Sequence, residues 1–234
     1  MSSICDTKVS AIILAGGSGT RMRSDITKQK MLLGGISVLK RSVTAFEHCA
    51  DIDEILVIVR EDELEFAREE LKDMKKVVGV GIGGSTRVES AERGFSMISD
   101  DVGYVAIHDA ARPLVTPEMI SEVISEAKRR GAATLASPVI DTIKIINNEG
   151  KIESTPRRSS LIRATTPQVF EKKIYSNALS SVVDKSDITD DNMLVERSGV
   201  DVYAVVCDRE NPKLTSPSDI LYMQMLLDAE ESDE

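Results

Sequence analysis

A glycine-rich loop followed by two cations is the part of this sequence with the clearest chemical meaning. Three glycines follow the first apolar run of the chain, at Gly16, Gly17 and Gly19. Glycines allow backbone N–H groups to approach phosphate oxygens closely. Arg21 and Lys28 come next, and a planar guanidinium with a compact ammonium suits the crowded, charged phosphorus centre of a nucleotidyl transfer. The loop therefore predicts a phosphate-binding site.

Two commoner glycine loops do not fit these residues. The nucleotide P-loop requires Gly-Lys-Ser/Thr after four intervening residues, and the sequence does not contain it. The dinucleotide fingerprint requires another glycine spacing and an acidic ribose ligand after the second strand, where Arg60 stands before Glu61 and Asp62. These differences disfavour an NAD-type dehydrogenase. On the loop alone, a tight turn without a ligand and solvated side chains at Arg21 and Lys28 stay open as alternatives.

Strands and helices alternate along the first half of the chain. Short apolar runs rich in β-branched residues predict strands at residues 9–14, 55–59, 77–80 and 102–107. Helices are predicted at residues 38–48, 62–71, 87–98 and 117–130, the last with Thr116 as cap and Gly131 at its end. This alternation indicates an α/β fold with a Rossmann-like, mostly parallel sheet and helices on both faces. Such sheets bind ligands beyond the carboxyl ends of their strands, where the glycine loop lies.

The second half of the chain begins with a different pattern. Strands are predicted at residues 133–139 and 143–146, followed by a turn at 147–150 and a short run at 151–153. Residues 139–166 therefore predict a β-hairpin arm that projects from the sheet. Because an isolated hairpin is marginal in water, we expect the arm to pack on a second subunit and form a homodimer. Helices at 172–183, 190–198 and 216–227 and a strand at 202–206 complete a single domain, residues 1–234, with a solvated acidic tail at 228–234.

Composition limits the classes of partner. The formal net charge is -10 and the sequence has no long run of Lys or Arg, so attraction to nucleic acid or to an anionic membrane is not expected. The first apolar run is too short to span a membrane and lacks a basic leader. The cysteines, at Cys5, Cys49 and Cys207, do not have the spacing of a disulfide framework or a zinc site. We therefore expect a cytoplasmic protein that acts on small molecules.

Several motifs spread along the chain narrow the phosphate chemistry. They are residues 15–22 with Lys28 and Gln29, then residues 83–90, 108–113, 138–144, 166–170 and 189–191. The first resembles the loop of the sugar-phosphate nucleotidyltransferases. The whole set, in order along the chain, is similar to the 2-C-methyl-D-erythritol 4-phosphate cytidylyltransferases of the non-mevalonate isoprenoid pathway. The resemblance implies transfer of the cytidylyl group of CTP to a small sugar-alcohol phosphate, with release of pyrophosphate and with Mg²⁺ as cofactor.

The same resemblance implies a role for each residue that matches the family. The catalytic candidates are Arg21, Lys28, Arg158 and Lys213. The candidates for binding CTP are Ala15, Gly16, Gly17, Gly19, Gly83, Gly84, Ser85, Arg87, Ser90 and Asp109. The candidates for binding the acceptor phosphate are Arg112, Thr142, Thr166 and Thr189. Mg²⁺ is expected to bind mainly through the CTP phosphates, with Asp109 as a possible protein ligand.

Some assignments stay open at the level of sequence. Arg157 adjoins Arg158, so a slip of one residue would exchange them, and both are compatible with solvated positions on the arm. His108 is a tempting general base, but an anionic phosphate monoester needs none, so we interpret His108 as a packing residue. The sequence also departs from the family pattern, with Thr27 in place of Pro, Ser85 in place of an acidic residue and Pro212 before Lys213.

Two other functions remain compatible with the motifs. A ribitol-5-phosphate cytidylyltransferase shares the glycine loop and the CTP turn, although Ala111 and residues 141–144 favour methylerythritol phosphate as the acceptor. A catalytically idle nucleotide-binding module would be expected to have lost Arg21 or Lys28, and both are present.

Overall fold

Seven strands rich in apolar residues form one central sheet in the computed structural model, which describes residues 7–17 and 27–233, with residues 230–233 as backbone alone. In chain order they are β1 (Lys8–Leu14), β4 (Glu54–Val59), β5 (Val77–Ile82), β6 (Val102–Asp109), β7 (Ala132–Pro138), β10 (Ile162–Glu171) and β11 (Tyr203–Val206). Across the sheet the order is β11-β7-β10-β6-β1-β4-β5. All neighbours are parallel except β10, which is antiparallel to both β6 and β7. The predicted mostly parallel sheet is confirmed.

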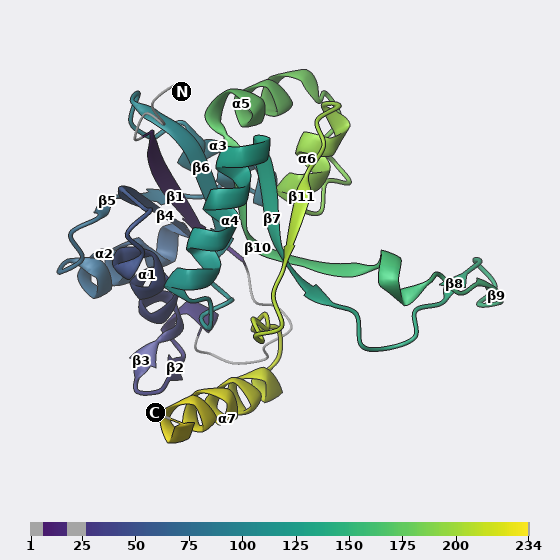
Figure 1. Ribbon diagram of the computed structural model, residues 1–234. Helices are drawn as coiled ribbons and strands as arrows, with labels where there is room; N and C mark the ends of the chain where they lie inside the picture. The colour runs from purple at the N-terminus through teal and green to yellow at the C-terminus, as the bar shows by residue number, and fades with distance from the viewer. Residues whose placement is uncertain (1–6, 18–26, 234) are drawn as a thin grey trace.

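Helices cover both faces of this sheet (Figure 1). On one face lie α1 (Val38–His48), α2 (Leu64–Leu71) and α4 (Pro117–Arg130), and on the other α3 (Arg87–Phe95), α5 (Lys172–Ser181) and α6 (Asp191–Arg197). The alternation of β1 explains the two layers: Ala11 and Ile13 pack into the first core, whereas Ile12 and Leu14 pack into the second. With both faces buried, the carboxyl ends of β1, β4 and β6 meet at one edge of the sheet.

Local signals fix where the helices begin and end. The side chain of Thr116 accepts a hydrogen bond from Met119 N–H at the start of α4, and Gly131 ends the helix with a φ of 91°. The side chain of Thr86 caps α3 in the same way, accepting from Glu89 N–H. The predicted bounds of α1 and α4 are confirmed residue for residue. Capping therefore holds the first turn of α3 beside the end of β5.

The arm projects away from the packed body of the protein (Figure 1). It contains β8 (Ile145–Ile146) and β9 (Ile152–Ser154), which pair antiparallel, and the short 3-10 helix η4 (Arg158–Ser160). Gly150 closes the hairpin turn with a φ of 81°. The predicted end of the arm at residue 166 is wrong, because Ile162 already pairs with Pro138 and begins β10. The sequence hides this strand because Arg163 and Pro167 interrupt its apolar pattern.

The end of the chain forms one long helix, α7 (Pro217–Asp233). It lies against the small hairpin of β2 (Leu32–Leu33) and β3 (Ile36–Ser37), where Met223 and Leu33 are buried in a third apolar cluster. The backbone of 228–233 thus continues the helix, whereas the sequence predicted its end at residue 227. Two further 3-10 turns, η2 (Lys28–Lys30) and η3 (Glu61–Glu63), complete the secondary structure of the described residues. Within the described residues, no helix has the length and apolarity needed to cross a bilayer.

Candidate active site

The carboxyl ends of β1 and β6 and the N-terminus of α3 surround a cavity of about 410 Å³. Nine of the residues singled out from the sequence line it: Gly16, Gly17, Lys28, Gly84, Ser85, Arg87, Ser90, Asp109 and Lys213. They come from segments nearly two hundred positions apart in the chain, and the sheet brings them to one edge. Four other residues also line the cavity, and the sequence predicted no place in the site for them: Leu14, Gln29, Thr86 and Ala111.

The turn before α3 is held in shape by hydrogen bonds from its own helix. Ser90 Oγ accepts from Gly84 N–H at 3.1 Å and donates to the Thr86 carbonyl at 2.8 Å. Glu89 Oε2 accepts from both the backbone N–H and the hydroxyl of Ser85, each at 2.7 Å. Side-chain atoms of Glu89 occupy the space that a Cβ at Gly84 would need. Only glycine fits at Gly84, and the turn is formed before any ligand arrives.

Asp109 lies at the end of β6 and holds two cations. Its Oδ1 accepts from Arg87 Nε at 3.2 Å, and its Oδ2 accepts from Lys213 Nζ at 2.6 Å. Burial alone would raise the pKa of Asp109, but the charges of Arg87 and Lys213 outweigh it and hold the pKa well below its usual range. The carboxylate is therefore ionised at neutral pH and orients both cations toward the cavity that they line.

A second carboxylate completes the charged cluster, by which we mean Arg87, Asp109, Asp191 and Lys213. Arg87 Nη1 donates to Asp191 Oδ2 at 2.5 Å, and Tyr175 OH donates to Asp191 Oδ1 at 2.7 Å. Asp191 is fully buried at the start of α6. Burial, reinforced by this carboxylate, raises the pKa of Tyr175 well above its usual range. Arg87 thus bridges two acids, a role that the sequence did not reveal, although Asp191 belongs to one of its motifs.

Lys28 stands between the glycine loop and the segment that carries Lys213. Its Nζ donates to the Leu214 carbonyl at 3.3 Å. The next residue, Gln29, donates from Nε2 to the Ala15 carbonyl at 3.3 Å, and Ala15 N–H donates to the Ile58 carbonyl at 2.7 Å. These bonds tie both ends of the loop to the sheet. Gly19 and Arg21 lie outside the described residues.

Comparison with known proteins agrees with this geometry. A profile of the 2-C-methyl-D-erythritol 4-phosphate cytidylyltransferase family matches residues 9–229. The chain belongs to this family. It is 37% identical to the 2-C-methyl-D-erythritol 4-phosphate cytidylyltransferase of Syntrophus aciditrophicus, over 96% of this chain and 97% of the relative. The protein of the same name from Caldanaerobacter subterraneus is 38% identical, over 94% of this chain and 98% of the relative.

Solved structures of family members share the fold. The 4-diphosphocytidyl-2C-methyl-D-erythritol synthase of Anaerococcus prevotii superposes with a TM-score of 0.86 at 28% identity, covering 95% of this chain and 97% of that one. The 2-C-methyl-D-erythritol 4-phosphate cytidylyltransferase of Thermus thermophilus gives a TM-score of 0.74 at 28% identity, covering 94% and 98%. The fold of the solved family members therefore extends over nearly the whole length of this chain.

Two residues expected to bind the acceptor phosphate lie behind the cavity of this cytidylyltransferase family member. Thr166 is 3% exposed, and its Oγ1 is already bonded to Asp109 N–H at 3.1 Å and to His108 Nδ1 at 2.9 Å. Arg112 donates from Nη1 to the Asn211 carbonyl at 2.8 Å, while its buried Nε has no partner among the described residues. The Thr166 hydroxyl thus supports its neighbours, and the Arg112 guanidinium retains an unsatisfied donor.

The remaining family positions lie apart from the cavity. Thr142 and Arg158 are exposed on the arm, and Thr189 is exposed in the segment before α6. Arg157 is also exposed, immediately before η4. None of these four side chains lines the cavity within one chain.

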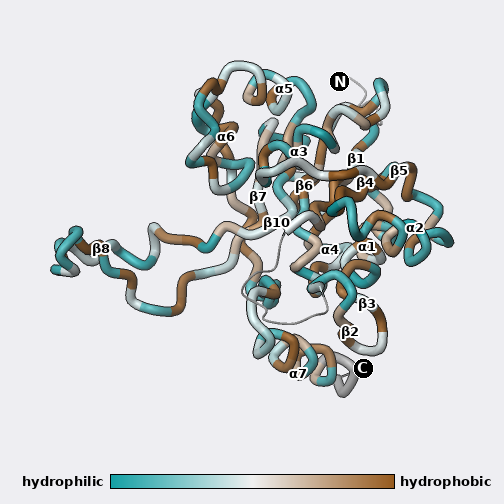
Figure 2. Tube along the Cα trace, turned by 180° about the vertical axis from the view of Figure 1, so that it is seen from behind, coloured by the Kyte–Doolittle hydropathy of each residue, from teal (hydrophilic) through white to brown (hydrophobic). Residues whose placement is uncertain are grey.

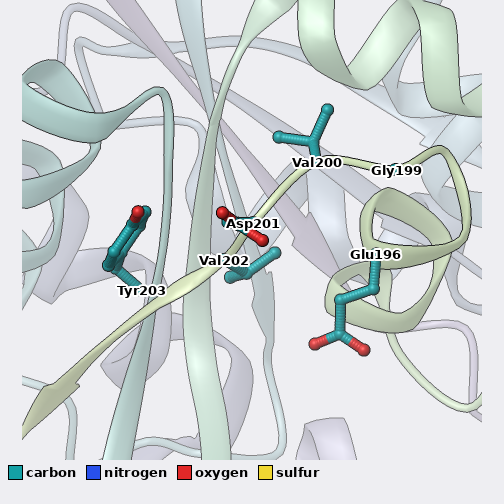
Figure 3. Close-up of a pocket in the computed structure, with 6 residues that line it drawn as sticks. All are labelled: Glu196, Gly199, Val200, Asp201, Val202 and Tyr203. Carbon is teal, nitrogen blue, oxygen red and sulfur yellow. The ribbon is translucent and has the colours of Figure 1, made fainter.

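A second hollow lies at the start of β11, lined by Glu196, Tyr203 and residues 199–202 (Figure 3). Its charged lining residues are the two acids Glu196 and Asp201. Arg130 lies near it, 4.3 Å over the ring of Tyr203, but does not line it. A hollow with this charge does not suit a triphosphate, so the first cavity is the candidate active site.

Proposed function

We propose that this protein transfers the cytidylyl group of CTP to 2-C-methyl-D-erythritol 4-phosphate. A phosphate oxygen of the acceptor forms a bond to the α-phosphorus of CTP, the bond to the β-phosphate breaks, and pyrophosphate leaves with the electron pair. The product is 4-diphosphocytidyl-2-C-methyl-D-erythritol, an isoprenoid precursor. The observation that carries this proposal is the convergence of Lys28, Arg87, Asp109 and Lys213 with two glycine turns around one cavity, in a chain of this family.

The two glycine turns divide the recognition of CTP between them. Gly83, Gly84, Ser85 and Ser90 would hold cytosine: its N4 donor suits backbone carbonyls of the turn. Its N3 and O2 acceptors would take the Gly84 N–H and the Ser90 hydroxyl in exchange for their bonds within the turn. Gly16, Gly17 and Gly19 would hold the phosphates through backbone N–H groups, next to Ala15, whose own N–H donates to the Ile58 carbonyl at 2.7 Å. The preformed hydrogen bonds of Ser90 and Glu89 support this assignment, because a turn that is already ordered loses little entropy on binding.

Lys28 and Arg21 would stabilise the charge that develops on the α-phosphate and on departing pyrophosphate. Lys213 would add a third cation, held in place by Asp109 at 2.6 Å. The acceptor phosphate monoester is already anionic at neutral pH, so no general base is needed. The chemistry is positioning and charge stabilisation.

Mg²⁺ is the cofactor that a triphosphate of this kind brings with it. The described residues contain no group of three or more His, Cys, Asp or Glu side chains that would hold a metal. Among the described residues that line the cavity, Asp109 is the only acidic one, and both of its oxygens already have cationic partners. These donors fit a cation carried mainly by the CTP phosphates, with Asp109 beside it. When bound, Mg²⁺ would neutralise phosphate charge.

The acceptor site would be completed by a second subunit through the arm. Thr142, Arg158 and Thr189 would contact the methylerythritol phosphate together with Arg112. Exposed isoleucines support a homodimer, since the arm leaves five of them uncovered: Ile140, Ile143, Ile145, Ile146 and Ile152. Figure 2 displays these hydrophobic stretches along the arm, away from the packed body.

Pyrophosphate release tests the proposal. CTP, UTP, ATP and GTP are each supplied with methylerythritol phosphate or ribitol 5-phosphate, and we expect release only with CTP and methylerythritol phosphate. Lys28→Ala and Arg21→Ala should each lower kcat by about 10²-fold or more, the range for loss of one transition-state stabiliser. Lys30→Ala is the control, because Lys30 is exposed in the same turn with its Nζ 5.1 Å from the Phe66 ring.

Three outcomes contradict the proposal. Equal or faster turnover of ribitol 5-phosphate would reassign the acceptor. No release from any pair of substrates by folded protein would indicate a nucleotide-binding module. Wild-type kcat in both Lys28→Ala and Arg21→Ala would remove the assigned roles.

A further inference from the structure

Four residues behind Asp109 are joined by hydrogen bonds into a closed ring, which we call the His108 ring: His108, Thr166, Asn211 and Arg112. His108 Nδ1 and Thr166 Oγ1 are 2.9 Å apart, and Asn211 Nδ2 donates to the Thr166 carbonyl at 3.0 Å. Arg112 Nη1 donates to the Asn211 carbonyl at 2.8 Å. The Arg112 carbonyl lies 3.2 Å from His108 Nε2 and closes the ring.

The ring joins elements that are far apart in the sequence. His108 belongs to β6, Arg112 to the loop after it, Thr166 to β10, and Asn211 to the loop that leads from β11 to α7. His108 is fully buried, and Thr166 and Asn211 are each 3% exposed. Hydrogen bonds at this depth are not exchanged for bonds to water, so losing one partner leaves the other unsatisfied.

The ring fixes where each proton of the imidazole lies. A carbonyl oxygen accepts only, so the Arg112 carbonyl requires a proton on His108 Nε2. Thr166 Oγ1 accepts from Asp109 N–H at 3.1 Å, and its own proton is then directed at His108 Nδ1. These two partners leave His108 with one proton, on Nε2, and so fix a neutral imidazole in a single tautomer.

The two nitrogens of His108 therefore serve different neighbours. Through Nδ1 and the Thr166 hydroxyl, His108 holds the backbone of Asp109, the residue that orients Lys213 and Arg87. Through Nε2, it holds the carbonyl of Arg112, whose side chain has a buried donor without a partner among the described residues. The first neighbour belongs to the CTP half of the site and the second to the acceptor half.

We propose that His108 is a positioning residue that holds the two halves of the active site independently, the CTP half through Nδ1 and the acceptor half through Nε2. This inference rests on the proposed function. His108 touches neither substrate and exchanges no proton. It acts as a neutral bridge of fixed polarity between Asp109 and Arg112.

Two substitutions of His108 distinguish the roles of its two ring nitrogens. Asparagine places an amide oxygen near the position of Nδ1 and loses the donor to Arg112, whereas glutamine reaches the position of Nε2 as a donor and loses the acceptor for Thr166. We expect His108→Asn to raise KM for methylerythritol phosphate about 10-fold and to leave KM for CTP unchanged. We expect His108→Gln to raise KM for CTP and lower kcat, each about 10-fold, and to leave KM for the acceptor unchanged.

A matched control separates this role from a general loss of stability. Val123→Ala removes buried apolar atoms from α4, forms none of the hydrogen bonds of the His108 ring, and should lower the unfolding temperature without changing either KM. The proposal is overturned if both His108 variants change all three constants in parallel with unfolding temperature, or if neither changes any constant. If the wild-type protein turns over no acceptor, the proposed function fails. Titration calorimetry of CTP binding to the wild-type protein and both His108 variants then tests the positioning role independently of turnover, since only His108→Gln should bind CTP more weakly.

Discussion

The charged cluster and the arm differ in how far a single chain supplies partners for their side chains. In the cluster, Asp109 and Asp191 share Arg87, Lys213 pairs with Asp109, and Tyr175 satisfies the last oxygen of Asp191. In the arm, five isoleucines are between 43% and 66% exposed. One region is complete within a single chain, and the other leaves its apolar surface uncovered.

From this difference we infer that CTP and the acceptor depend on different regions of the protein. Charges can be buried only beside opposite charges and hydrogen-bond partners, and the charged cluster finds these partners on β6, α3, α6 and the segment after β11 of one chain. The arm has too few neighbours in its own chain to bury its isoleucines. The acceptor residues Thr142 and Arg158 lie on that arm, so we infer that acceptor binding depends on assembly and CTP binding does not.

Breaking the charged cluster should produce the largest effect. Asp191→Asn keeps the shape of the side chain but removes the fully buried charge that pairs with Arg87 at 2.5 Å. We expect the free energy of unfolding to fall by about 3 kcal/mol, because Arg87 keeps its charge and loses its buried partner. Urea unfolding measures this loss. Glu196→Gln, exposed on the same helix, is the control and should change the free energy by less than about 0.5 kcal/mol. Equal effects of the two substitutions would contradict the role of the cluster.

Disrupting the arm should have a smaller and more selective effect. Ile146 is paired with Ile152 across the hairpin and is 59% exposed. We expect Ile146→Lys to shift sedimentation from dimer to monomer and to raise KM for the acceptor about 10-fold, equivalent to one well-made contact, with KM for CTP unchanged. Val183→Lys is the control, since Val183 is 96% exposed beyond α5. A wild-type monomer at micromolar concentration would refute the assembly.

Acid should reveal the neutral state of His108. The unfolded chain binds a proton at this residue near pH 6.5, whereas the folded protein does so only near pH 3. Since the unfolded state binds more protons between these values, the free energy of unfolding should fall as pH falls, by up to about 1.4 kcal/mol per pH unit. Asp109 and Arg112 are the charged groups that face the imidazole, and Asp109 begins to titrate only at lower pH. Urea unfolding of His108→Gln between about pH 7 and pH 5 should have a shallower slope; an unchanged slope would contradict this assignment.

The regular elements were predictable because their signals are local. The helix at residues 117–130 carries its own cap, first-turn proline and terminal glycine, and these alone set its bounds. β10 was not predictable, because its partners β6 and β7 are contributed by distant segments and its own pattern is broken by Pro167. The course of α7 beyond residue 227 was also missed, since its packing on β2 is a tertiary contact.

In the candidate site, too, the features with local sequence signals were predictable and the contacts between distant segments were not. Glycine spacing and the cations after it singled out the loop and Lys28, because close backbone approach and phosphate charge demand those residue types. The resemblance to the family singled out the turn before α3, Asp109 and Lys213. The partners of these residues could not be read from the sequence. Asp109 meets Arg87 and Lys213 across 22 and 104 positions, and His108 meets Thr166 across 58.

The sequence by itself determined which chemistry this protein carries, since phosphate binding is written in a short loop and its cations. Only the tertiary structure decided which side chains line the cavity and which support them from behind. Burial made that distinction: it placed the Thr166 hydroxyl and the His108 imidazole behind the cavity, where each polar atom must bond to protein.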